Sequence, residues 1–442
     1  MLNGASCAGV VATLLLQRSS ALDINVNDHD SIRSAAGIVA NDLMSLYVNN
    51  GNTTPAYLVG TFAKPVYWWE AGAAWGGMVD YWSYTNDETY VASTKQALLF
   101  QAGPSNDFMN DQWKKELGND DQSFWALTAM TAAEQNFPAA DTGNPSWLDM
   151  AVRVFESQIA RWDTSTCGGG LRWQIYPENN GYNYKNSVSN GGLFQLAARL
   201  FRYTGNSTYS DWANRIWDWS TSVDFVDSTY NVYDGASDQD GCDPVDKLQW
   251  TYNLGLYLYG TANMWNATEG TVQAWHTRTQ GLVDSASIFF GQASNSTNVM
   301  YEAACEPNGM CDTDQRSFKA YLSRWMGKTS VLCPWTTSQV LPKLRASAEG
   351  AAEACSGGVD GKTCGAKWYI GGFDGITGVG EQLSALEVFD ALLAGNSPGP
   401  AVQSDSALFA NVITVTKTSG ASQCPHCLRR ALLKLCPHTM GS

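Results

Sequence analysis

The chain has 442 residues, a formal net charge of −15 and a sequence pI near 4.6. This acidity argues against nucleic acid and against anionic membrane surfaces as electrostatic partners. Hydrophobic residues make up 44% of the sequence, enough for a large core, whereas charged residues make up only 16%. Trp occurs 18 times and Tyr 19 times. We expect most of these rings in the core, yet such a composition also suits neutral polyhydroxylated ligands, whose sugar rings stack on aromatic faces.

The N-terminal segment has the pattern of a secretory signal peptide. An apolar run from Gly9 to Leu16 is too short for a membrane span, and Ser19-Ser20-Ala21 supplies small residues for a cleavage site. We therefore assign residues 1–21 to a signal peptide and expect a mature chain that begins at Leu22. Asn-x-Ser/Thr sequons agree with passage through the secretory pathway. They lie at Asn52, Asn206, Asn266 and Asn295.

Cysteine spacing indicates an oxidising compartment, because two pairs would each close a short loop and a third pair could span a longer one. The candidate pairs are Cys305–Cys311, Cys355–Cys364 and Cys167–Cys242. Cys333 then has no obvious partner. The chain has only four His, two of them next to Cys near the C-terminus. We therefore expect no catalytic zinc and no cofactor.

Helical stretches of two kinds alternate along the body of the chain. The stretch at 208–223 places Trp212, Ile216 and Trp219 on one face and charged residues on the others, as in an outer amphipathic helix. The stretch at 248–266 has no charged residue but too many polar ones for a membrane span, which indicates an inner, buried helix. The twelve predicted stretches are 30–49, 67–83, 88–101, 119–136, 146–162, 186–204, 208–223, 248–266, 270–290, 313–328, 337–355 and 377–394.

Six inner and six outer helices predict an all-α fold, an (α/α)6 toroid, as one domain over residues 22–395. No Pro/Ser-rich linker divides this region, and the aromatic segment 171–176 is a candidate short strand or hairpin on the rim. Residues 396–442 are predicted to form a flexible or poorly ordered tail. The tail contains Cys424-Pro425-His426-Cys427, a weak metal or redox signal without a second cysteine pair.

Two adjacent carboxylates stand at the start of a buried helix, in the run Asn119-Asp120-Asp121-Gln122. One interpretation is structural: Asn119 is the N-cap, the two Asp face the positive end of the helix dipole, and Gln122 is at the capping-box position. The other is catalytic, because glycosidic cleavage needs a carboxylic acid and a carboxylate. Neighbouring Asp carboxyls can lie roughly 5–7 Å apart. This range includes the separation of about 5–5.5 Å in retaining enzymes and just reaches the range of inverting enzymes.

Several segments combine amides, acids and aromatic residues, and the first of them precedes the predicted helix 186–204. Each segment taken alone is a turn or a helix cap. Their recurrence between outer and inner helices favours a polar ligand site on a shared rim. The segments are Gly181–Asn186, Tyr233–Gly235, Gln249–Asn253 and Gly372–Gly375.

Four runs of the sequence resemble signatures of glycoside hydrolase family 76, and most closely its fungal branch of cell-wall endo-α-1,6-mannosidase-like proteins. The runs are Trp69–Gly76, Asn119–Gln122, Gly181–Asn186 and Gln249–Asn253. Further similar runs are Cys305-Glu306, Asp314–Lys319 and Trp325-Met326. The resemblance covers about residues 25–395.

This resemblance implies retaining cleavage of α-1,6-mannosidic linkages, with Asp120 as nucleophile and Asp121 as general acid/base. It implies as substrate the mannose of wall mannan or of glycosylphosphatidylinositol (GPI) anchors, with transfer to a β-glucan acceptor as a further step. From the motifs and loops together we expect a set of substrate-binding residues. They are Trp69, Gln122, Asn183, Tyr184, Asn186, Asp234, Trp250, Tyr252 and Asp374.

Fungal members of the family usually end in a lipid-anchor signal, and the basic C-terminal residues Arg429 to Lys434 do not fit one. We expect a protein that is secreted or located in the cell wall or at the outer face of the plasma membrane, with membrane association only through an anchor. Two alternatives remain. One is a different enzyme on the same toroid, an unsaturated-uronyl hydrolase or a sugar epimerase; the epimerase is disfavoured because it needs a His base and the body offers little besides His276. The other is a non-catalytic glycan-binding wall protein.

Overall fold

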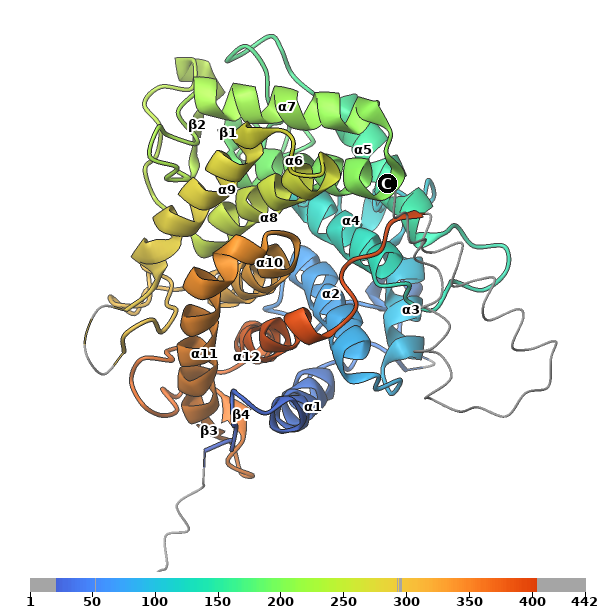
Figure 1. Ribbon diagram of the computed structural model, residues 1–442. Helices are drawn as coiled ribbons and strands as arrows, with labels where there is room; N and C mark the ends of the chain where they lie inside the picture. The colour runs from blue at the N-terminus through green and yellow to red at the C-terminus, as the bar shows by residue number, and fades with distance from the viewer. Residues whose placement is uncertain (1–20, 52, 292, 294–295, 404–442) are drawn as a thin grey trace, which may run out of the picture.

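A computed structural model describes residues 21–403, with the exception of residues 52, 292, 294 and 295. In this part of the chain twelve α-helices form two concentric rings (Figure 1). The inner ring contains α2 (Trp68–Thr85), α4 (Asn119–Glu134), α6 (Ser187–Thr204), α8 (Thr251–Ala267), α10 (Phe318–Leu332) and α12 (Val379–Leu393). The outer ring contains α1 (His29–Ser45), α3 (Val91–Gln101), α5 (Trp147–Ile159), α7 (Ser207–Ser222), α9 (Gln273–Ser285) and α11 (Thr337–Ala354).

The inner ring is closed. Each inner helix packs against the next, from α2 through α4, α6, α8 and α10 to α12, and α12 packs in turn against α2. The outer helices cover the inner ones, α3 on α2, α5 on α4, α7 on α6, α9 on α8, α11 on α10 and α12, and α1 on α12. The predicted (α/α)6 toroid is therefore confirmed, and each of the twelve predicted helical stretches overlaps one of these helices, with boundaries that differ by up to several residues.

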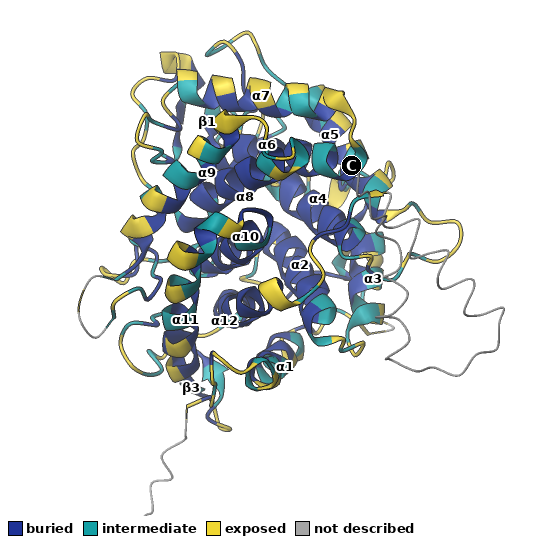
Figure 2. Cartoon of the chain, viewed as in Figure 1, coloured by how far each residue is buried: buried dark blue, intermediate teal, exposed yellow. Residues whose placement is uncertain are grey.

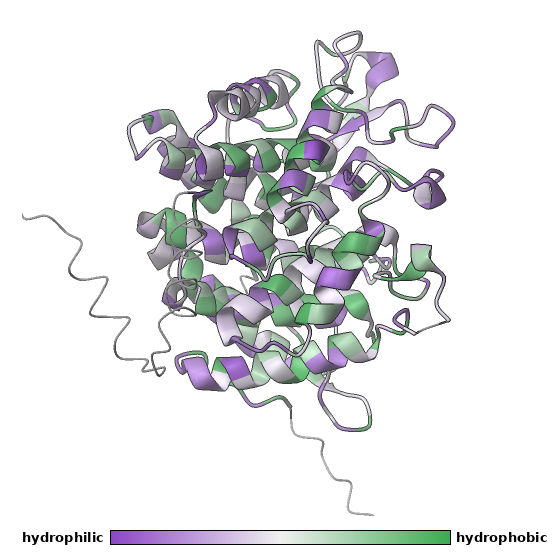
Figure 3. Ribbon diagram, turned by 90° about the vertical axis from the view of Figure 1, so that its right-hand side faces the viewer, coloured by the Kyte–Doolittle hydropathy of each residue, from purple (hydrophilic) through white to green (hydrophobic). Residues whose placement is uncertain are grey.

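The inner helices are more buried than the outer helices, as the sequence pattern predicted. Every residue of α12 is buried, whereas the outer helices expose one face to solvent (Figure 2). In α7 the side chains of Ile216 and Trp219 face the core, and Asp211 and Asp218 are exposed. Viewed from the side, hydrophilic and hydrophobic residues alternate along the surface helices (Figure 3). None of the described helices is both long and apolar enough to span a membrane.

Glycine lets the inner helices approach one another closely. A Cβ added to Gly72 on α2 would lie 2.7 Å from the ring of Trp125 on α4, and one on Gly260 would lie 2.4 Å from the ring of Phe194. Real Cβ atoms do not come so near to a neighbouring ring, so large aromatic side chains occupy space that only glycine leaves free. The tight inner ring thus depends on glycines that face aromatic residues of the next helix.

Ion pairs are buried between the inner helices, toward their C-terminal halves. Arg324 contacts Glu387 at 2.5 Å, Arg199 contacts Glu134 at 2.7 Å, and Lys328 contacts Asp80 at 2.8 Å. All of these side chains are at most 4% exposed. Each buried cation has a buried carboxylate partner, which offsets the cost of taking its charge out of water.

The connections at the two ends of the toroid differ in length. Inner helices pass to outer helices through short segments such as 205–206 and 268–272, whereas outer helices pass to inner helices through long ones such as 160–186 and 286–317. The long connections contain β1 (Tyr184–Asn186) paired antiparallel with β2 (Gly235–Ser237), and β3 (Cys355–Gly357) paired with β4 (Thr363–Cys364). They also contain the disulfides Cys167–Cys242, Cys305–Cys311 and Cys355–Cys364, as predicted, whereas Cys333 is a buried thiol.

Two sequence predictions need correction. Segment 171–176 is not a strand; it forms single antiparallel bridges, Arg172 with Lys185 and Gln174 with Gly118, because it crosses between two neighbouring segments. The packed chain also extends beyond the predicted boundary at residue 395. The N–H of Ala401 donates to the carbonyl of Glu134 at 2.8 Å, and Arg202 binds the carbonyl of Ala401 at 3.1 Å.

Some sequence predictions lie outside the described residues. They are residues 1–20 of the signal peptide, the sequons at Asn52 and Asn295, and the tail beyond residue 403 with its cysteine pair. Asn206 and Asn266 are described and exposed, directly after α6 and near the end of α8.

The glycine–aromatic contacts lead to a stability prediction. Gly72→Ala should lower the free energy of unfolding by about 1–3 kcal/mol, because the new methyl group overpacks the inner ring. Gly37→Ala is the matched control, since Gly37 is also in mid-helix but its added Cβ would meet Tyr81 at an ordinary 3.4 Å. Chemical denaturation of both variants measures the difference, and equal stabilities would contradict the packing argument.

Candidate active site

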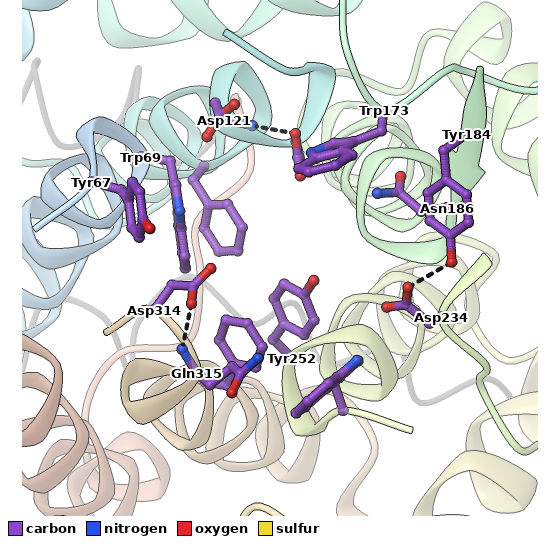
Figure 4. Close-up of a pocket in the computed structure, with 14 residues that line it drawn as sticks. Tyr67, Trp69, Asp121, Trp173, Tyr184, Asn186, Asp234, Tyr252, Asp314 and Gln315 are labelled. Carbon is purple, nitrogen blue, oxygen red and sulfur yellow. Dashed lines mark hydrogen bonds between the residues drawn. The ribbon is translucent and has the colours of Figure 1, made fainter. Parts of the chain in front are cut away.

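A pocket of about 410 Å³ lies at the end of the toroid where the long connections enter the inner helices. The N-terminal turns of α2, α4, α8 and α10 contribute to it, and β1 precedes α6 at its edge (Figure 4). Its lining consists of Tyr67, Trp69, Asp120, Asp121, Phe124, Trp173, Tyr184, Asn186, Asp234, Trp250, Tyr252, Asp314, Gln315 and Phe318. These residues include four aspartates and no Lys, Arg or His.

The first turn of α4 presents the adjacent aspartates to this pocket. Gly118, not Asn119, is the N-cap, in an extended conformation with φ −97° and ψ 167°. Its N–H donates to Asp121 Oδ2 at 2.5 Å, so Asp121 occupies the capping-box position predicted for Gln122. The N–H of Asp121 donates to Asp120 Oδ1 at 3.0 Å. Both carboxyls therefore cap the helix and face the pocket.

The two carboxyl groups are close together because Gly118 has no side chain. A Cβ added there would lie 2.2 Å from Asp120 Oδ1 and 2.8 Å from Asp121 Oδ2. These two oxygens are therefore within about 5 Å of each other. Retaining glycosidases hold their carboxyl pair about 5–5.5 Å apart, and inverting ones about 6.5–9.5 Å apart. This upper limit lies below the inverting range.

Asp120 and Asp121 differ in pKa because their surroundings differ. Burial raises the pKa of Asp120 to about 7, although the backbone N–H groups of Asp121 and Asp120 and the side chain of Trp173 lower it by hydrogen bonding. Burial raises the pKa of Asp121 well above its usual range, and the charge of Asp120 raises it further, although the hydrogen bond from the N–H of Gly118 lowers it. Hydrogen bonds favour the charged form of a carboxyl, and a like charge nearby disfavours it. Asp120 is thus the member that ionises first, and Asp121 keeps its proton.

Polar side chains outside the pocket fix this first turn from both sides. Arg161 donates from Nε to Asn119 Oδ1 at 2.9 Å and from Nη2 to Gln122 Oε1. Gln158 donates to the carbonyl of Asn119 at 2.7 Å. The residues on either side of the aspartate pair are thereby held by the end of α5 and the segment that follows it. Side chains with locked partners are what a catalytic pair needs to keep its geometry.

The β1–β2 ladder positions a second group of pocket residues. Tyr184 on β1 donates its hydroxyl proton to Asp234 Oδ2 at 2.8 Å, and burial raises the pKa of Asp234. Asn186 caps α6 by accepting from the N–H of Ser189 at 3.2 Å. Between them, Lys185 points away into the protein and contacts Asp163 at 3.1 Å. The alternation of the strand thus directs Tyr184 and Asn186 to the pocket and the lysine to a buried ion pair.

Aromatic side chains form an apolar surface in the pocket. The rings of Tyr252 and Phe318 stack in parallel with centroids 3.8 Å apart, and the rings of Trp69 and Phe124 meet at 4.6 Å. Such faces can pack against the C–H side of a sugar ring while the aspartates accept hydrogen bonds from its hydroxyls.

The structure brings together most of the predicted site residues. In the pocket lining are both catalytic candidates and six predicted binding residues, Trp69, Tyr184, Asn186, Asp234, Trp250 and Tyr252. Three predicted binding residues lie elsewhere. Gln122 is buried and donates to the carbonyl of Asp107 at 2.7 Å. Asn183 is exposed outside the lining. Asp374 accepts from backbone N–H groups of Ala366, Lys367 and Ile376, which fixes a turn.

Sequence reasoning missed six lining residues. They are Tyr67, Phe124, Trp173, Asp314, Gln315 and Phe318. The sequence pointed to some of them. Asp314, Gln315 and Phe318 belong to a run that resembles the family, and Trp173 belongs to the aromatic segment 171–176. Burial raises the pKa of Asp314 to about 8, and the neighbouring Asp312 raises it further through a hydrogen bond and its charge.

The candidate base of the epimerase alternative lies away from this site. His276, the candidate base of an epimerase, is on outer helix α9 and stacks on Trp335 with ring centroids 4.4 Å apart. It does not line the pocket. Within residues 21–403, apart from the four undescribed positions, no group of three or more His, Cys, Asp or Glu is placed to hold a metal ion.

Comparison with known proteins agrees with this arrangement. The sequence profile of glycosyl hydrolase family 76 matches residues 31–404. The chain belongs to this family. It is 45% identical over 397 residues to the mannan endo-1,6-alpha-mannosidase DCW1 of Saccharomyces cerevisiae. The matched region covers 89% of this chain and 86% of that protein. The family consists of glycosidases, and the resemblance inferred from the motifs is confirmed.

Solved structures share the fold. Dfg5 from Chaetomium thermophilum, in complex with glucosamine, superposes with a TM-score of 0.81 at 38% identity and covers 86% of this chain and 94% of its own. The family 76 α-1,6-mannanase of Salegentibacter sp. HEL1_6 superposes with a TM-score of 0.64 at 18% identity. The superposition covers 82% of this chain and 99% of the mannanase chain. The latter structure is an inactive variant, with two consecutive aspartates changed to asparagine, bound to α-1,6-mannotriose.

The contact of Gly118 with both carboxyls predicts an effect on activity. Gly118→Ala should reduce kcat about 10²-fold, because a methyl group must displace the carboxyls by roughly 1 Å. The backbone conformation of Gly118 suits alanine, so the effect is steric. Gly395→Ala serves as control, since its added Cβ would meet no atom within 4 Å. Equal glycosidase rates for the two variants would contradict the inferred geometry.

The raised pKa values also predict how stability depends on pH. An unfolded Asp ionises near pH 4, whereas Asp120 and Asp121 keep protons to higher pH when folded. The folded state then binds more protons than the unfolded state. This contribution to stability is therefore complete below about pH 4 and is lost as pH rises through the raised pKa values of the folded state, about 7 for Asp120. Asp121→Asn removes the buried acid but keeps an oxygen for the N–H of Gly118. Its melting temperature should exceed that of the unmodified protein by a few degrees at pH 8, with a smaller gap at pH 4. A gap that does not change with pH would contradict the assignment.

Proposed function

We propose that this protein is a retaining mannan endo-1,6-α-mannosidase-like glycosidase. Its substrate is the α-1,6-linked mannose of cell-wall mannan or of GPI-anchor glycans. The observation that carries the proposal is the pair of buried, adjacent carboxyls of Asp120 and Asp121 over an aromatic surface in a family 76 toroid. The activity named for the fungal relative at 45% identity supports the same substrate.

In the first step Asp121 donates its proton to the glycosidic oxygen while a carboxylate oxygen of Asp120 attacks the anomeric carbon. The bond to the leaving sugar breaks, and a glycosyl ester of Asp120 forms. In the second step Asp121, now a carboxylate, accepts the proton of an incoming hydroxyl group. That oxygen bonds to the anomeric carbon and Asp120 is released. The order of the two pKa values supports this division of roles.

We further propose that the incoming hydroxyl belongs to a sugar acceptor such as wall β-glucan in preference to water, so that the enzyme transfers mannoprotein to the wall. The structure of the fungal relative Dfg5 with glucosamine supports an amino sugar as part of the bound glycan, since a GPI core contains one and the pocket here is acidic. The disulfides support action outside the cytosol, in the secreted, wall-associated protein that the sequence predicts.

Substitution of each aspartate tests the mechanism. Asp120→Asn and Asp121→Asn should each lower kcat on α-1,6-mannan by about 10³-fold or more. With an α-mannosyl fluoride donor, whose leaving group needs no proton, azide should restore turnover of Asp121→Asn and give the α-azide. Azide acting on Asp120→Asn should give the β-azide, because the nucleophile itself is then missing. Product anomers are measured by NMR.

The exposed Asp211 on outer helix α7 provides a matched control, and Asp211→Asn should retain full activity. Wild-type-like activity of either pocket variant contradicts the mechanism. If the unmodified protein binds α-1,6-mannan but never cleaves or transfers it, the alternative of a non-catalytic glycan-binding wall protein is favoured instead.

A further inference from the structure

Two carboxylates and two cations form a largely buried cluster beside the β1–β2 ladder, outside the pocket lining. We call it the Arg172 cluster. Arg172 Nη2 lies 3.0 Å from Asp163 Oδ2, and its Nη1 pairs with Asp238. Lys185 Nζ lies 3.1 Å from Asp163 Oδ2, and none of the four side chains is more than 17% exposed. Burying four charges is costly unless each is paired, so the cluster restricts the chain to the arrangement that pairs them.

Further contacts hold the guanidinium of Arg172 in this cluster. Its central carbon lies 4.7 Å from the ring centroid of Tyr182, and its Nη1 donates to the carbonyl of Tyr182 at 3.4 Å. The Cys167–Cys242 disulfide joins the segments that follow the two carboxylates, Asp163 and Asp238. The guanidinium is therefore held between groups that are themselves fixed.

The backbone of segment 172–174 connects the Arg172 cluster with the first turn of α4. The carbonyl of Arg172 accepts from Asn119 Nδ2 at 2.9 Å, and the carbonyl of Trp173 accepts from the N–H of Asn119 at 2.8 Å. On its other side the segment binds β1, where the N–H of Trp173 donates to the carbonyl of Tyr184 at 2.6 Å. The position of Arg172 thus sets where Trp173 lies relative to the aspartate pair.

The indole of Trp173 reaches the nucleophile. In Figure 4 the hydrogen bond from the N–H of Asp121 ends at the carboxyl of Asp120, beside this indole. Burial raises the pKa of Asp120, and the hydrogen bond from the Trp173 side chain is among those that lower it. Gly181 packs on the ring, since a Cβ added there would lie 2.2 Å from Cε3 of Trp173. The indole is therefore held between a glycine and the carboxylate that it stabilises.

We propose that Arg172 is a positioning residue for the nucleophile: through segment 172–174 it holds the indole of Trp173 against the carboxylate of Asp120. This inference rests on the function proposed above. It gives the Arg172 cluster a role at the aspartate pair, although none of its four side chains lines the pocket. A displaced indole leaves the nucleophile harder to ionise and less precisely oriented.

The charges around Asp120 are known well enough to design a test. Asp163 stays ionised where Asp120 titrates: burial raises its pKa, but hydrogen bonds from Ser165 and Thr166 bring it below its usual range. Other titratable groups act on Asp120 from three elements, and none of them is changed in the variants below. They are Asp121 on α4, Asp314 before α10 and Tyr252 on α8.

The pH dependence of fluoride release tests the positioning. With an α-mannosyl fluoride donor the leaving group needs no proton, so the acidic limb of the kcat/KM profile reports ionisation of Asp120. Trp173→Phe should move this limb to higher pH by about one unit, the loss of one hydrogen bond to a charged group. Arg172→Gln should move it in the same direction, and Arg172→Lys should restore it. A variant that carries both Arg172→Gln and Trp173→Phe should move it no further than Trp173→Phe alone, because the two residues act through one contact.

Asp238→Asn separates positioning from a direct effect of charge. Removing the positive charge of Arg172 by itself raises the pKa of Asp120, whereas removing the negative charge of Asp238 lowers it. Displacement of the indole raises it in both variants. Arg172→Gln and Asp238→Asn should therefore both shift the acidic limb upward, by about 0.5–1 unit. Exposed Arg215 on outer helix α7 lies 4.5 Å over the ring of Trp212, and Arg215→Gln is the matched control that should leave the profile unchanged.

An NMR titration separates this inference from the proposed function. The indole N–H signal that disappears in Trp173→Phe belongs to Trp173, and its chemical shift follows ionisation of Asp120 without turnover. Its midpoint should move upward in Arg172→Gln and in Asp238→Asn, and the latter provides the test if the former does not fold. If midpoint and acidic limb stay unchanged, or if the shifts of Arg172→Gln and Trp173→Phe add, the positioning role is wrong. If the unmodified protein releases no fluoride but the midpoints move, the proposed function is wrong while Arg172 still positions Trp173 against Asp120.

Discussion

Two carboxyl groups buried next to each other at the start of one helix are the constraint on which the active end of this protein depends. Placing Asp120 and Asp121 side by side disfavours ionisation of both, and the protein balances that cost by hydrogen bonds from the first turn of α4 and by the positive end of its dipole. Gly118 makes the arrangement possible because no side chain occupies the space that the carboxyls need. The resulting difference in proton affinity is what acid/base and nucleophilic roles require.

α4 is one of several inner helices whose N-terminal turns contribute to the pocket. The inner helices direct their N-terminal ends to the pocket, where aspartates are found, and bury cations such as Arg324 and Lys328 toward their C-terminal halves. Long connections are confined to the pocket end, and the described disulfides are all in them. A rigid inner ring therefore supports loops that are free to differ in chemistry.

The same features connect stability to function. Buried acids with raised pKa values, among them Asp120 and Asp314 at about 7 and 8, make the folded state less stable as pH rises. A protein that functions at acidic pH avoids most of this cost. Tight glycine–aromatic contacts in the inner ring stabilise the scaffold independently of pH. They offset the cost of burying acids at the active site.

The sequence by itself determined the twelve helical stretches, their division into inner and outer rings, the two short cysteine loops and the aspartate pair, whereas it offered Cys167–Cys242 only as a candidate pairing. These features depend on local patterns: charge-free helices are buried, short cysteine loops close easily, and family motifs are contiguous. Only the tertiary structure decided that Gln122 and Asp374 serve the scaffold, that Gly118 caps α4, and that Trp173 and Asp314 line the pocket. A run of residues shows which side chains are available. The direction in which each one points is set by the long connections that pack against one another across the end of the ring, over distances in the chain that no local pattern spans.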